Sequence, residues 1–283
     1  MRTKRVHVIG GLPRSGTTLL YELLTSCFRI DGRVPHEKNL LSPYAYNHNI
    51  YCTKSLGEAS TARTLLRWDP LLWIVCIIRD PRDAVCSVSH RRKPGQYFAN
   101  LGIWNCEYPE IKKMRRHPRY VELRYEDLVH EPDAIQRYLY SRLPFLEKTH
   151  NFSEYPKCAN IPEESLPALS SIRPISPSGI GSWKRHKQHL SKQIATYGDI
   201  SDDLIELGYE KDRSWLIDLA MEQGNENIQL SVRRPPLRTC RALSRPERYI
   251  RYSLYWLCKI PLLGSVLVRI NEKRKHFLQP RKT

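Results

Sequence analysis

A glycine-bounded loop, Gly11–Thr18, holds the residues near the start of the chain that are best suited to chemistry. It has the pattern G-x-x-x-x-G-x-[ST], between an apolar run and a leucine-rich segment. Backbone N–H groups in such a loop point at a bound anion, and the following helix N-terminus adds about half a positive charge. An ATP-binding loop carries a lysine after its last glycine, but Thr17 stands there, and the cation lies inside the loop as Arg14. We expect phosphate-like oxygens here, but not a metal-bridged triphosphate.

A second basic motif, "IIRDPRDAVCS", begins at Ile77. Arg79 ends an apolar run, and Ser87 follows on the same segment. A guanidinium forms charge-assisted hydrogen bonds to an oxyanion, and a serine after about two helical turns returns to the same side. The spacing is therefore compatible with a joint contact of Arg79 and Ser87 to an anion, although the motif alone is also typical of a strand-to-helix turn.

The stretch Pro13–Leu20, "PRSGTTLL", closely resembles the 5′-phosphosulfate loop of sulfotransferases that use 3′-phosphoadenosine 5′-phosphosulfate (PAPS). It is most similar to the branch with arginine in this loop, which includes tyrosylprotein, bacterial and glycan sulfotransferases. In that family an arginine and a serine spaced as in the second motif hold the 3′-phosphate. The resemblance implies PAPS contacts from Pro13, Arg14, Ser15, Gly16, Thr17, Thr18, Arg79 and Ser87.

Two later segments extend the resemblance, which covers about residues 5–187. "GIGSWKRH" is similar to the family segment that folds over the nucleotide, which implies that Trp183 binds the nucleotide and that Lys184 and Arg185 contact its 3′-phosphate. The triplet upstream reads Ser-Pro-Ser, whereas cytosolic family members have Arg-Lys-Gly. "VELRYEDLVHEP" resembles the family's strand and turn, where we expect Glu126 and Asp127 to cap the next helix rather than to do chemistry.

The family reaction is in-line transfer of a sulfuryl group from PAPS to a hydroxyl or amine, which releases 3′-phosphoadenosine 5′-phosphate (PAP). The resemblance implies that Arg14 stabilises the bridging oxygen, that Lys54 reaches the transferring group and that no metal is needed. A general base must accept the acceptor's proton, and "VPHEKN" offers Glu37, which we prefer, or His36. Lys54 as a surface residue, and Glu37 and His36 on a solvated loop, are the alternatives.

Alternating apolar runs and helical patterns predict the elements that must position these residues. They indicate an α/β, P-loop-NTPase-like three-layer fold with a central, mostly parallel sheet flanked by helices. We expect a sulfotransferase domain over 1–232 and a basic, partly amphipathic extension over 233–283. The expected strands are 6–10, 49–54, 71–78 and 120–124, and the expected helices are 17–27, 59–68, 81–91 and 132–143.

The charge balance, 46 Lys+Arg against 29 Asp+Glu, gives a net charge of +17 and implies an anionic partner. Nucleic acid is not the expected partner, because helix-turn-helix, RNA-recognition and zinc-finger patterns are absent from the sequence. A nucleotide kinase or NTPase with a degenerate loop is the enzyme alternative. The sequence argues against it, because the loop lysine and an obvious Walker-B aspartate are both missing. The expected acceptor is a carbohydrate hydroxyl, with peptidyl tyrosine as the alternative.

The tail holds an apolar stretch, 252–268, of 17 residues interrupted by Lys259 and Pro261. A spanning helix needs about 20 apolar residues, so segment 249–275 is expected either to lie in a membrane interface or to close over the core. The eight cysteines are scattered without a C-x-x-C pair, which favours free thiols and a reducing compartment. With no signal-peptide pattern, we expect a cytoplasmic location, with membrane association at the C-terminal segment, unless a leader has been removed.

Overall fold

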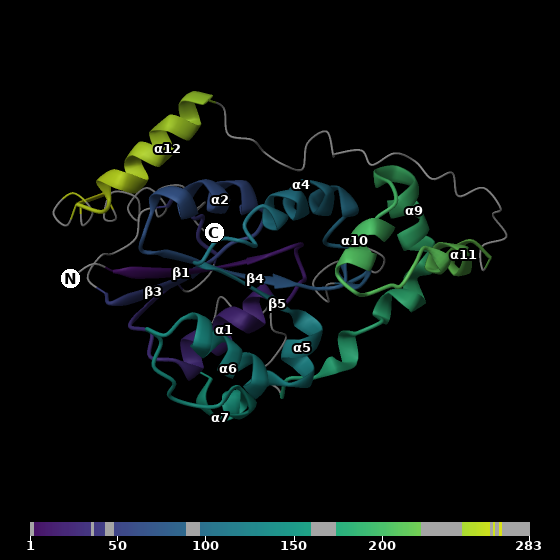
Figure 1. Cartoon of the computed structure of the whole chain (residues 1–283), viewed down its shortest axis with the longest axis horizontal. Helices are drawn as coiled ribbons and strands as arrows, with labels where there is room; N and C mark the ends of the chain where they lie inside the picture. Colours follow the sequence, from purple (N-terminus) through teal and green to yellow (C-terminus); the bar gives the residue numbers. More distant parts are fainter. Residues whose placement is uncertain are drawn as a thin grey trace, which may run out of the picture.

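The computed structural model describes residues 3–34, 37–42, 48–88, 97–159, 174–221, 245–260, 263, 266 and 267. Its sheet has five strands in the order β2-β3-β1-β4-β5, and every paired neighbour is parallel. This confirms the predicted α/β class with a central parallel sheet (Figure 1). The strands are β1 (Lys4–Gly10), β2 (Gly32–Arg33), β3 (Ile50–Lys54), β4 (Leu72–Ile78) and β5 (Tyr120–Arg124).

Helices cover both faces of the sheet and complete three layers (Figure 1). On one face lie α2 (Ala59–Trp68) and α4 (Leu101–Lys112), which pack against each other. The other face carries α1 (Thr17–Cys27), α5 (Tyr125–His130), α6 (Pro132–Arg142) and α7 (Tyr155–Cys158). The remaining described helices are α3 (Pro81–Val85), η1 (Phe152–Glu154), η2 (Pro177–Gly179), η3 (Ser182–His186), α9 (Lys187–Tyr197), α10 (Ser201–Glu206), α11 (Ser214–Met221) and α12 (Arg245–Leu257).

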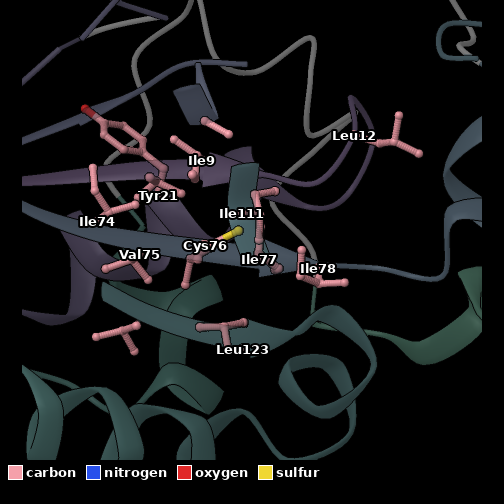
Figure 2. Packing of buried hydrophobic residues seen from close by; sticks show 14 of the residues in the cluster. Ile9, Leu12, Tyr21, Ile74, Val75, Cys76, Ile77, Ile78, Ile111 and Leu123 are labelled. Atoms are coloured by element: carbon pink, nitrogen blue, oxygen red, sulfur yellow. The ribbon is translucent and has the colours of Figure 1, made fainter. Parts of the chain in front are cut away.

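The core lies between the sheet and its two helical layers (Figure 2). Strand β4 is apolar along its whole length, and Ile74–Ile78 are fully buried, as expected of a parallel strand covered on both faces. Tyr21 from α1 and Ile111 from α4 belong to the same buried cluster. Full burial of such a side chain stabilises the fold by about 1.5–3 kcal/mol, which makes the sheet a rigid support for the loops at its ends.

Helix α3 is shorter than predicted, and this changes the position of the second motif. The helix expected to run to Arg91 ends at Val85. The amide of Ser87 donates to the carbonyl of Ala84 over 3.3 Å, which is a tight closing turn, and Val88 then pairs antiparallel with Tyr97. Ser87 therefore lies beyond the helix, so the two-turn spacing predicted from Arg79 is wrong.

The cysteines differ in part from the expectation of free thiols. Six described cysteines are free, and most of them are buried. Cys106, on α4, is disulfide-bonded, so the expectation is wrong at this position. The expected cytoplasmic location stays a prediction. Among the described helices, none combines the length and apolar character needed to cross a bilayer.

Candidate functional site

The loop after β1 has the backbone shape of an anion cradle. The amide of Leu12 donates to Ser15 Oγ over 3.1 Å, and the amide of Ser15 donates to the carbonyl of Leu12 over 3.3 Å. Gly16 has φ 96°, and an added Cβ there would lie 2.6 Å from the Tyr125 ring, so glycine is required twice over. Arg14 has φ 74°, a left-handed conformation that costs a non-glycine residue about 1–3 kcal/mol and recurs at functional sites.

Arg14 joins this loop to the segment after β4. Its Nε donates to Ser87 Oγ over 3.1 Å, while Arg79 Nη1 donates to the carbonyl of Arg14 over 3.0 Å. The Arg79 guanidinium also lies 4.5 Å from the centre of the Tyr125 ring. The structure thus brings Arg14, Arg79 and Ser87 together, with Ser87 bonded to Arg14.

The two arginines form a partly desolvated concentration of positive charge. Burial lowers the pKa of Arg14, the Arg79 charge lowers it further, and Tyr125 opposes the shift. Arg79 is buried, and within the described residues its Nε has no hydrogen-bond partner. Two like charges held together away from water are unfavourable unless an anion compensates them. The pair therefore fits a phosphate or phosphosulfate group.

Lys54 ends β3 beside the loop. It pairs in register with Val8 of β1, and its Nζ donates to Thr18 Oγ1 over 2.8 Å. Only 1% of the residue is exposed, so the surface-lysine alternative is wrong. Burial lowers the pKa of Lys54, while the charges of Glu37 and Glu22 act in the opposite direction. A buried cation here can donate to an oxyanion held by the loop.

Of the two candidate bases, the structure describes Glu37 and not His36, which lies outside the described residues. Glu37 is exposed, and its charge acts on the pKa of Lys54. The amide of Lys38 donates to the carbonyl of Lys54 over 2.9 Å, which fixes this loop at the end of β3. The assignment of the base to Glu37 or His36 stays a prediction.

A buried polar network holds the two residues on either side of Lys54. His7 of β1 is hydrogen-bonded through Nδ1 to Thr53 Oγ1 at 2.6 Å and through Nε2 to Ser55 Oγ at 2.9 Å. Ser55 donates to Glu58, whose carboxylate also accepts the amide of Leu40 over 2.7 Å. Burial and then the Arg5 charge hold the pKa of His7 well below its usual value. In the sequence this network is visible only as a histidine inside an apolar strand, and the position of His7 does not reveal which residues it contacts.

The segment with η2 and η3 folds back over the second motif. Arg79 Nη2 donates to the carbonyl of Gly179 over 2.6 Å. Asp83 accepts from the Gly181 amide at 2.8 Å, from Ser182 Oγ at 3.0 Å and from the Trp183 amide at 2.9 Å. Asp83 is therefore the residue that holds this segment against the site, and sequence reasoning missed it.

The three residues predicted from this segment have different surroundings. Trp183 is buried, and the Arg82 guanidinium lies 4.4 Å from the centre of its ring. Lys184 and Arg185 are exposed. Their contacts with a 3′-phosphate stay predictions.

Glu126 has a different role from the expected helix cap. Its carboxylate accepts from the Asp80 amide at 3.0 Å and from the Tyr209 hydroxyl at 2.8 Å, and α5 begins without a side-chain cap. Glu126 therefore fixes the turn that follows β4. The neighbouring Tyr125 supports both Gly16 and Arg79, a function that its sequence position did not reveal.

Comparison with known families decides the class of enzyme. Residues 5–149, just over half of the chain, match the model of the sulfotransferase domain. The chain belongs to this family. No match is found among curated proteins. Among solved structures, the sulfotransferase domain from the curacin biosynthetic pathway has a TM-score of 0.42 and 17% identity, and the match covers 80% of this chain and 99% of that domain.

Membership confirms the predicted sulfotransferase family and the prediction of an enzyme, and it decides against the kinase alternative. The matched range holds Arg14, Lys54, Arg79 and Ser87, and it ends before the segment with η2 and η3. Sulfotransferases of this family generally take the sulfuryl group from PAPS.

Proposed function

We propose that this sulfotransferase moves the sulfuryl group of PAPS to an acceptor hydroxyl and releases PAP. The observation that carries the proposal is the meeting of three neighbouring strands at their carboxyl ends. Strand β1 leads into the Arg14 loop, β3 ends at Lys54, and β4 leads to Arg79 and Ser87. Ligands of parallel α/β sheets bind at this end of the strands.

Each residue has a role that follows from its position. The loop amides and the hydroxyls of Thr17 and Thr18 hold the oxygens of the 5′-phosphosulfate, as helix N-termini hold anions. Arg14 stabilises the bridging oxygen on which negative charge develops, and Lys54 donates to the transferring group. The sulfur–oxygen bond to PAP breaks as a bond to the acceptor oxygen forms, and the acceptor's proton passes to Glu37 or His36.

The 3′-phosphate is assigned to Arg79 and Ser87, with Lys184 and Arg185 at its solvent side. The buried Nε of Arg79, without a hydrogen-bond partner among the described residues, supports this assignment. Recognition of a 3′-phosphate would distinguish PAP from nucleotides that carry only 5′-phosphates.

The expected transfer needs no metal, because a sulfuryl group carries less negative charge than a phosphoryl group and basic side chains can stabilise it. Turnover in excess EDTA should therefore equal turnover in buffer with magnesium. Loss of activity in EDTA that magnesium restores would contradict this part of the proposal.

We assign the acceptor to the carbohydrate class, with acidic glycans preferred because the net charge of +17 favours an anionic partner. The test is incubation of the purified chain with radiolabelled PAPS and pools of glycans or tyrosine-containing peptides. Label should appear in glycans, and removal of a candidate hydroxyl should abolish it. Label in tyrosine peptides alone would assign the alternative acceptor, and label in neither pool would contradict both assignments.

A further inference from the structure

Polar contacts join the C-terminal helix α12 to the body of the protein. The Tyr255 hydroxyl donates to the buried carboxylate of Asp69, and Lys259, just after the helix, forms an ion pair with the same carboxylate. Burial raises the pKa of Glu58, and the Arg251 charge is one of several groups that act in the opposite direction. Tyr255 and Lys259 thus fix the C-terminal end of α12 at Asp69, directly after α2, and Figure 1 shows α12 on the same side of the sheet as α2.

The opposite face of α12 is apolar and exposed. Its large side chains recur at helical spacing, and Ser253 is the polar residue among them. The exposed fractions are 75% for Tyr249, 60% for Ile250, 39% for Trp256, 42% for Leu257 and 47% for Ile260. A surface helix normally exposes its polar side chains and buries its apolar ones, whereas α12 exposes large apolar side chains.

Exposed apolar side chains also occur next to Asp69 and beyond α12. Trp68 ends α2 directly before Asp69 and is 71% exposed. Leu263 and Val266, beyond α12, are also exposed. A large exposed apolar surface marks a docking site, and we name the set Tyr249, Ile250, Trp256, Leu257 and Ile260 on one side of α12 the apolar face.

The charges that flank this segment in the sequence identify the kind of partner. Arg67 is exposed beside Trp68. In the sequence, cations both precede and follow the apolar stretch, and they are Arg245, Arg248, Arg269, Lys273, Arg274 and Lys275. Aromatic residues with flanking arginine and lysine are typical of segments that lie in the headgroup region of an anionic bilayer.

We propose that the apolar face docks on an anionic membrane surface, with α12 lying in the interface. The inner side of α12 lies near the loop with Glu37, because the Lys38 charge opposes the rise that burial causes in the pKa of Cys258, directly after α12. If the proposed function holds, docking would bring the loop with Glu37 close to the headgroups. Membrane-linked acceptors would then be the favoured substrates.

The test is flotation of the full chain with phosphatidylcholine vesicles, with and without phosphatidylserine. The wild type should float with the anionic vesicles, and binding should weaken as salt rises. The double variant Ile250→Glu with Leu257→Glu should lower the partition coefficient by at least about tenfold, because carboxylates are unfavourable in the interface. The matched control is Ile217→Glu, at a residue that is 61% exposed on α11, and it should bind like the wild type.

Three outcomes would overturn the proposal. They are failure of the wild type to bind anionic vesicles, equal binding by the double variant, and self-association that the double variant abolishes, which would assign the face to a second copy of the chain. The rise in melting temperature with PAP should be the same in all variants. That readout reports the sulfotransferase site alone, so failure of the membrane proposal is distinguishable from failure of the proposed function.

Discussion

Arg14 Nε and Ser87 Oγ are joined by a 3.1 Å hydrogen bond across two loops that follow adjacent strands, β1 and β4. The bond orients the guanidinium that the sequence placed inside the loop. Because Arg79 donates to the carbonyl of the same residue, Arg14 is held through both its side chain and its backbone. Such fixed cations need little reorganisation when charge develops on a bound group.

Replacement of Arg14 by glycine removes the guanidinium but keeps the backbone conformation, so it isolates the contribution of the side chain to catalysis. Arg14→Gly keeps the carbonyl that Arg79 uses and suits the positive φ. We expect turnover to fall by about 10²–10³-fold, with the free energy of unfolding within about 1 kcal/mol of the wild type. Steady-state rates and thermal melts measure both. Arg14→Ala is the control, because it also lacks the guanidinium but should unfold more easily than Arg14→Gly; wild-type turnover in either variant would contradict the role of Arg14.

Lys54 should act as a charged donor with a lowered pKa. Lys54→Met should reduce kcat by about 10²–10³-fold while the protein stays folded, because the new side chain is similar in length and suits the buried site. In the wild type, the rate should fall as pH rises through the lowered pKa, below the value of about 10.4 for an ordinary lysine. Lys54→Arg should move this limb to higher pH. A limb that stays in place would show that another group titrates.

Asp83 should control the segment with η2 and η3. Asp83→Ala leaves the amides of Gly181 and Trp183 without their acceptor, which costs about 1–3 kcal/mol for each group that water does not reach. We expect faster hydrogen exchange over 179–186 and weaker PAP binding. Asp127→Ala, at an exposed aspartate, is the matched control. Unchanged exchange in Asp83→Ala would contradict the account.

Several elements were predictable because they depend on local pattern alone. Helices α1 and α2 begin and end at the predicted residues, since apolar side chains recur there at helical spacing. Strand β4 was visible as an unbroken apolar run. The turn between β1 and α1 was predicted from the glycine spacing of Gly11–Thr18, because an anion cradle depends on consecutive residues.

The rest depends on contacts between distant segments. The end of α3 at Val85 and the bond from Arg14 to Ser87 arise from a turn that the apolar pattern did not reveal. Lys54 is buried because β3 pairs with β1, which places it beside Val8, and this pairing cannot be read from the sequence. Asp83 was invisible for the same reason, since its three donors lie about a hundred residues further along the chain.

Buried His7 should make stability depend on pH. Its pKa is lowered, so below about pH 6.5 the unfolded chain binds a proton that the folded chain does not. Stability therefore falls as pH decreases from about 6.5 toward the lowered pKa, by at most about 1.4 kcal/mol per pH unit from this group. Denaturant unfolding across this range should show a shallower fall for His7→Gln. His130→Gln, at an exposed histidine, should keep the wild-type slope, and an equal slope in His7→Gln would contradict the prediction.

The most direct test of the central claim is calorimetric binding of PAP in EDTA, compared with adenosine 5′-monophosphate, which lacks the 3′-phosphate. The account predicts that PAP binds at least about tenfold more tightly, because charge-assisted hydrogen bonds to a second phosphate each contribute about 1.5–3 kcal/mol. Arg79→Ala should remove most of this difference. Equal affinity for the two nucleotides, or binding only of ATP with magnesium, would contradict the assignment of Arg14, Arg79 and Ser87 to PAPS.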